Sequence, residues 1–148
     1  MPGVVSDPPP APPVRAVVLS PAAPLSARVW GFELVKVNQT TTRVARGGSR
    51  PLCQAIPFTA QRVLVRWAHA RAGQGLKLDV RAPGHRTRTR TLALVRAGSG
   101  RRTVELTPRG EGLTDEAFPG GRYTFTLRLG ARRLDRTSLT LTNAVRAC

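Results

Sequence analysis

Apolar and polar residues alternate strictly near the end of the chain, where residues 118–142 read FPGGRYTFTLRLGARRLDRTSLTLT. Tyr123 and Phe125 begin the apolar positions of a first strand, and Leu139 and Leu141 occupy those of a return strand. A period of two places one face of a strand on a core and the other in water. Because a short glycine-containing loop joins the two strands, we predict a β-hairpin that closes the fold.

The same alternation recurs upstream, separated by glycines and prolines every ten to fifteen residues. Gly31 interrupts the first of these stretches and predicts a β-bulge there. No window has the apolar spacing of a capped amphipathic helix. Short alternating stretches separated by turn residues are typical of an all-β sandwich or barrel. We predict a two-sheet antiparallel sandwich of seven to nine strands. The strands expected before the hairpin span 27–37, 40–45, 62–70, 76–81, 85–95 and 101–106.

The pattern also predicts a core and a division of the chain. We expect Trp67 to be the central core aromatic, and the other members of the same core to be Leu78, Val80, Tyr123, Phe125 and Leu141. At 148 residues the chain fits one domain that buries about two-thirds of its unfolded surface. Residues 1–26 are predicted to be a proline-rich arm or linker, 27–142 the sandwich, and 143–148 a tail.

The charge of the chain bears on its binding partners, because the formal net charge is +16 and 22 of the 24 basic residues are arginine. Such a surface attracts acidic polymers, nucleic acid or acidic proteins in a salt-dependent way. Near-total use of arginine over lysine is equally typical of a GC-rich coding sequence. Both interpretations, a selected anion-binding surface and a compositional bias, stay open at this point.

The most concentrated basic stretch is RTRTR, in which Arg86, Arg88 and Arg90 alternate with threonines. Neither face of such a strand is apolar, so we expect it to project as an exposed limb or edge. The three arginines are a candidate anion-binding site, since their spacing would let them follow a phosphate backbone. The alternative is that they protect a sheet edge from aggregation. We expect the fold to tolerate replacement of all three.

Catalytic chemistry has little support in the sequence. His69 and His85 are the only bases that titrate near neutral pH, and no nucleophile motif surrounds any serine or cysteine. The scattered histidines and cysteines have no metal-ligand spacing, and we predict no cofactor and no metal. Glu111, Asp115 and Glu116 lack the pattern of a calcium loop and are expected to form a solvated loop.

The two cysteines, Cys53 and Cys148, are a possible disulfide. Two unpaired thiols are the alternative, because two cysteines make no disulfide framework.

Residues 27–142 resemble bacterial immunoglobulin-like or fibronectin-III-like modules. The resemblance rests on a tryptophan-bearing strand, a strand that ends in Ala-Pro-Gly, an acidic loop, and the FPGGRYTF sequence before the last hairpin. It implies an immunoglobulin-like sandwich in which Tyr123 is the tyrosine-corner residue. Phe125 stands where antibody domains have a cysteine, so their inter-sheet disulfide is missing. The fold by itself does not define a function.

Together these features favour a non-catalytic structural or accessory binding module, such as a cell-envelope or virion component. Its expected partners are another protein or copies of itself. The alternative is a basic protein that binds nucleic acid or another acidic polymer. No stretch is apolar enough for a transmembrane segment. The N-terminus lacks the regions of a signal peptide, so the protein is intracellular, or it is extracytoplasmic or assembly-associated and begins after a removed signal.

Overall fold

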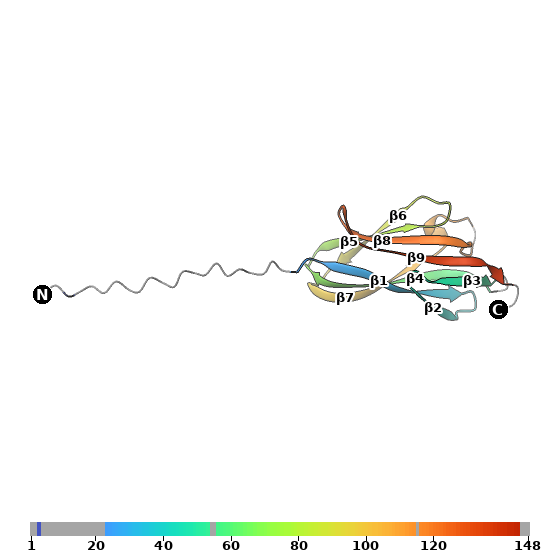
Figure 1. Ribbon diagram of the computed structural model, residues 1–148, viewed down its shortest axis with the longest axis horizontal. Helices are drawn as coiled ribbons and strands as arrows, with labels where there is room; N and C mark the ends of the chain where they lie inside the picture. Colours follow the sequence, from blue (N-terminus) through green and yellow to red (C-terminus); the bar gives the residue numbers. More distant parts are fainter. Residues whose placement is uncertain (1–2, 4–22, 54–55, 115, 146–148) are drawn as a thin grey trace.

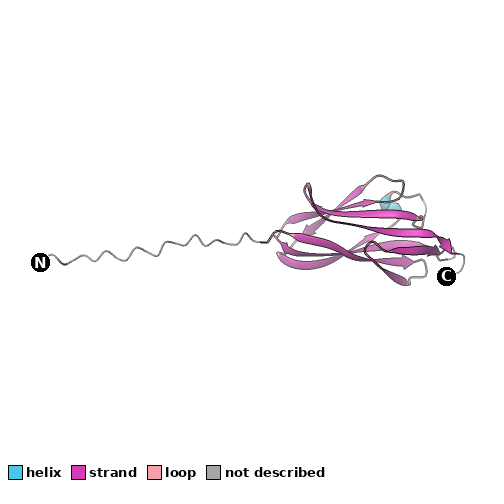
Figure 2. Cartoon of the chain, viewed as in Figure 1, coloured by secondary structure: helices cyan, strands magenta, loops and turns pink. Residues whose placement is uncertain are grey.

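Nine strands form two packed sheets in the computed structural model, which describes residues 3, 23–53, 56–114 and 116–145 (Figures 1 and 2). One sheet has four strands in the order β2-β1-β4-β7, and the other has five in the order β3-β9-β8-β5-β6. The strands are β1 Ser26–Lys36, β2 Thr41–Ala45, β3 Ser49–Cys53, β4 Phe58–Ala70, β5 Gln74–Arg81, β6 Arg88–Leu94, β7 Gly98–Leu106, β8 Gly121–Leu129 and β9 Arg132–Val145.

The structure confirms an all-β, immunoglobulin-like sandwich with seven to nine strands. Neighbouring strands pair antiparallel, with the exception of β3, which pairs parallel to β9. The exception arises where the chain leaves β2 and crosses between the sheets at Gly47 and Gly48. Gly47 donates its N–H to Ser138 O at 2.8 Å, and Gly48 O accepts from Thr140 N at 3.0 Å. These bonds start β3 alongside β9.

The centre of the core is the pair Phe32 and Phe125, whose ring centroids lie 4.8 Å apart. The prediction for Trp67 was wrong, because its side chain is half-buried at the border of the core. The register of β4 shifts between Trp67 and Ala70, so the alternation fails near the end of the strand. The bulge expected at Gly31 is present and turns Phe32 inward. The other predicted core residues are buried, namely Leu78, Val80, Tyr123, Phe125 and Leu141.

The turn before β8 has the hydrogen bond expected of a tyrosine corner. Tyr123 is buried and donates its hydroxyl to Pro119 O at 2.6 Å. Its ring packs edge-on against Phe118 at 5.9 Å between centroids. Burial raises the pKa of Tyr123, so the phenol stays protonated and keeps this bond throughout the neutral range.

The ends of the domain differ slightly from the predicted boundaries. β1 begins at Ser26, while β9 continues to Val145, past the boundary expected at 142. The division into arm, sandwich and tail stays a prediction, because most of residues 1–22 and all of 146–148 lie outside the described residues. Among the residues that the structure describes, no helix is long and apolar enough to span a membrane.

Candidate anion-binding surface

The second part of the RTRTR stretch, from Arg88 on, lies in β6, which is an edge strand as expected. Arg88 and Arg90 lie opposite Val80 and Leu78, whose side chains are in the core. The two arginines therefore point to the inner side of the sheet at its edge, where they contact the short 3-10 helix η1 (Arg109–Glu111). Arg88 Nη1 donates to Gly110 O at 2.8 Å, and Arg90 Nη2 lies 2.7 Å from Glu111 Oε1.

This arrangement corrects two expectations. Glu111 is not part of a solvated loop, because its side chain is only 3% exposed and pairs with Arg90. Replacement of all three arginines would leave that carboxylate buried without its charged partner, so the fold should not tolerate it well. Arg86 lies before the strand and is exposed. Anion binding by the three arginines together stays a prediction, with Arg88 and Arg90 already engaged within the domain.

A second basic surface lies on the outer face of the five-stranded sheet. Tyr123, Phe125 and Leu127 point into the core, so the alternate residues of β8 point outward. The register places Thr124 beside Ser138, Thr126 beside Arg136, and Arg128 beside Arg133. We call the row formed by Arg122, Thr124, Ser138, Arg136 and Arg133 the arginine track. Along β8 it extends from Arg122 to the position of Arg128, a rise of about 20 Å.

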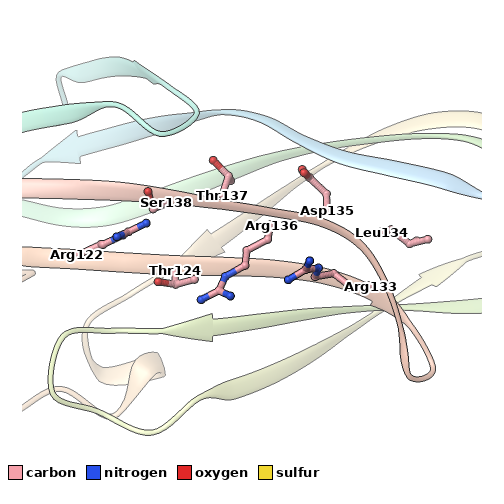
Figure 3. A pocket seen from close by; sticks show the side chains of 8 residues that line it. All are labelled: Arg122, Thr124, Arg133, Leu134, Asp135, Arg136, Thr137 and Ser138. Atoms are coloured by element: carbon pink, nitrogen blue, oxygen red, sulfur yellow. The ribbon is translucent and has the colours of Figure 1, made fainter.

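Figure 3 shows the guanidinium groups of Arg122, Arg136 and Arg133 arranged along β8 and β9, with the Thr124 hydroxyl among them. These residues line an open hollow of about 640 Å³ in which Leu134 is the one apolar residue of eight. Guanidinium and hydroxyl groups are the donors that bind phosphate, sulfate and carboxylate oxygens. The lining of the hollow therefore offers donors for anionic oxygen atoms and little apolar surface.

The arginines of the track lack acidic partners within the described part of the chain: Arg122, Arg133 and Arg136 form no ion pair there. The carboxylate that faces outward from β5 is Asp79, and it accepts from Arg128 Nε at 2.7 Å. Burial would raise the pKa of Asp79, but hydrogen bonds from Arg128 and Thr89 outweigh it and lower the pKa. The track therefore keeps its positive charge.

Asp135 also borders the hollow, and its charge is used on the other side of β9. It accepts from Arg46 Nη1 at 2.7 Å and from Val29 N at 2.9 Å, which ties the two sheets together. Figure 3 shows its side chain turned away from Arg136 and Arg122. Burial would raise the pKa of Asp135, but the hydrogen bonds from Arg46 and Val29 outweigh it and lower the pKa. Asp135 thus does not neutralise the track.

The alternation in β8 predicts Thr124 on the outer face, and Arg122 follows the same period. What it could not supply was the register with β9, since Arg133 falls in the loop that the pattern predicts. The sequence signal for Arg136 and Ser138 was their odd spacing from the inward Leu139, which puts them on the outer face, and it was obscured by the more conspicuous RTRTR stretch.

The two candidate histidines lie in different elements of the fold. His69 has φ of 59° at the β4 irregularity and is exposed, while His85 Nδ1 lies 2.8 Å from Pro83 O in an exposed turn. Within the described residues, no three His, Cys, Asp or Glu side chains cluster as metal ligands would. Cys53 is disulfide-bonded. Its predicted partner Cys148 lies outside the described residues, so the pairing stays a prediction.

A solved structure of an immunoglobulin-like protein from Pseudomonas aeruginosa aligns with a TM-score of 0.47 and 14% sequence identity, and the alignment covers 82% of this chain and 99% of that one. No protein-family model matches the chain, and no curated protein matches it. The strand order above is what defines the chain as an immunoglobulin-like sandwich.

Proposed function

We propose that this chain is a non-catalytic binding module that holds a linear anionic polymer along the arginine track. The observation that carries the proposal is the set of three guanidinium groups, from Arg122, Arg133 and Arg136, without acidic partners among the described residues. They lie on paired strands of a sheet whose inner face is core, so their backbone positions are fixed before binding. Preorganisation of this kind lowers the entropic cost of association.

The shape of the track supports a polymer over a single small anion. Its length of about 20 Å exceeds what one phosphate or sulfate group can contact. Ser138 and Thr124 lie between the arginines and add hydroxyl donors at intermediate positions. A polymer with regularly spaced charges could contact several of these groups at once, as expected of a module that holds a macromolecule within an assembly.

A matched pair of variants tests the proposal. The track variant replaces Arg122, Arg133 and Arg136 by serine. The control variant replaces Arg28, Arg66 and Arg101 by serine, so it loses the same charge as the track variant. These three residues are exposed on the outer face of the other sheet.

The readout is affinity for heparin and for single-stranded DNA of matched charge at near-physiological salt. We expect the track variant to bind at least about tenfold more weakly than the unmodified protein, since each charged hydrogen bond contributes about 1.5–3 kcal/mol. The control variant should bind nearly as well as the unmodified protein. Absence of binding by the unmodified protein, or equal losses in both variants, would contradict the proposal.

A further inference from the structure

Two residues with hydroxyl groups separate the charged positions of the arginine track. Thr124 of β8 lies directly opposite Ser138 of β9, one outward row away from Arg122 and one from Arg136. Outward rows of a sheet lie about 7 Å apart along the strand, so these two arginine rows are about 13 Å apart, with the hydroxyls midway. Figure 3 shows Thr124 between Arg122 and Arg136. A chain bound along the track therefore meets charged and hydroxyl groups in turn.

The hydroxyls of the track are not used within the domain. Thr124 and Ser138 are partly exposed, and neither side chain forms a hydrogen bond to another described residue. A hydroxyl at the other edge of the same face differs, because Thr89 of β6 donates to Asp79 Oδ1. The sheet thus pairs the hydroxyl of Thr89 and leaves those of the track free to bind a ligand.

The face that contains the track has no aromatic side chain among the described residues. The four phenylalanines and the tyrosine of the chain are buried, and the two tryptophans belong to β1 and β4 of the other sheet. Proteins that bind single-stranded nucleic acid stack its bases on aromatic side chains in addition to contacting its backbone. The track offers no such surface, so a nucleic acid would be bound there through its phosphates alone.

We infer that the polymer held along the track is an acidic polysaccharide, whose carboxylate or sulfate groups bind the arginines and whose sugar hydroxyls bind Thr124 and Ser138. A serine or threonine hydroxyl both donates and accepts, so it pairs with a sugar hydroxyl in either direction. Anionic oxygens only accept, and the guanidinium groups on either side are the stronger donors for them. The inference rests on the proposed function and names the class of polymer.

The test removes the hydroxyls and leaves the charge unaltered. The hydroxyl variant contains Thr124→Val and Ser138→Ala, and valine keeps the β-branched shape that suits a strand. The hydroxyl control contains Thr103→Val and Ser26→Ala, which make the same chemical change at exposed positions of the four-stranded sheet. Affinity is measured for polygalacturonate, which has carboxylates and sugar hydroxyls, and for polyphosphate, which has anionic groups and no sugar.

We expect the hydroxyl variant to bind polygalacturonate at least about fivefold more weakly than the unmodified protein, because two hydrogen bonds to the sugars are lost. Its affinity for polyphosphate should stay within about twofold, since the arginines are intact. The hydroxyl control should bind both polymers as the unmodified protein does. The unmodified protein should also bind polygalacturonate more tightly than oligodeoxythymidylate of equal charge number, which has no free sugar hydroxyl within its chain.

The outcomes separate this inference from the proposed function. Equal losses for the two polymers, no loss for polygalacturonate, or tighter binding of oligodeoxythymidylate would overturn the inference, while arginine-dependent binding of polyanions would stand. Binding of neither polymer by the unmodified protein would overturn the proposed function and the inference with it.

Discussion

The pair formed by Arg90 and Glu111 gives the sharpest prediction about stability. The Glu111 side chain is 3% exposed and that of Arg90 is 36% exposed, with 2.7 Å between Nη2 and Oε1. Breaking a fully buried pair costs about 3–5 kcal/mol, while an exposed pair contributes about 0–1 kcal/mol. Because one partner is buried and the other is partly exposed, we expect Arg90→Met to lower the free energy of unfolding by about 2–3 kcal/mol.

The neighbouring arginines of the same stretch are built-in controls. Arg88 loses one hydrogen bond to Gly110 O when replaced by serine, for a cost of about 0.5–1.5 kcal/mol. Arg86 forms no ion pair among the described residues, so Arg86→Ser should change stability by about 0.5 kcal/mol at most. The three effects should therefore rank Arg90 first, Arg88 second and Arg86 last.

Urea unfolding measures these differences, provided that the slope of free energy against urea is unchanged between variants. A double variant, Arg90→Met with Glu111→Leu, removes the buried charge together with its partner and should regain much of the lost stability. The reasoning fails if Arg90→Met costs no more than Arg86→Ser, or if the double variant is less stable than Arg90→Met alone.

Three further predictions concern other buried or paired groups. Gln61 is fully buried and neither of its side-chain polar atoms has a hydrogen-bond partner among the described residues, so Gln61→Met should raise the free energy of unfolding by about 1–2 kcal/mol, and a loss in urea unfolding would contradict this. The lowered pKa values of Asp79 and Asp135 stabilise the fold above their unfolded pKa, near 3.8, and this contribution should disappear as pH falls through the folded values. Unfolding curves at a series of pH values should therefore show less acid sensitivity in the Asp79→Asn, Asp135→Asn variant, and unchanged sensitivity would count against the two pairs. Peptide mapping without reduction should recover Cys53 joined to Cys148, whereas two alkylatable thiols would disprove that pairing.

The fold could be predicted largely from the sequence, because a strand with one buried face has alternating apolar and polar residues. In β8 the inward positions of Tyr123 and Phe125 repeat without a break, and the prediction there is confirmed. In β4 the same reasoning failed at Trp67, which keeps the register with Ala27 and Gly100 but lies near the end of the strand, where the indole is at the border of the core. Alternation identifies faces, and it does not show where a strand ends or bends.

The candidate site was less predictable, because charge in a sequence does not show which charges are already paired. In the sequence, nothing distinguishes Arg90 from Arg86. In the structure, Arg90 pairs with Glu111, twenty-one residues away. The arginine track depends on the register between β8 and β9, which brings Arg136 beside Thr126. Cross-strand register is a tertiary property, and local patterns leave it undetermined.

The central claim is that the arginine track, rather than the total charge of the chain, binds linear polyanions. Its most direct test is the slope of log affinity against log salt concentration for single-stranded DNA, compared between the track variant and the control variant. Loss of three phosphate contacts should reduce the steepness of that slope by about two in the track variant. The control variant, which carries the same net charge, should keep nearly the slope of the unmodified protein. Equal reductions in both variants would show that the charge acts diffusely and would contradict the account.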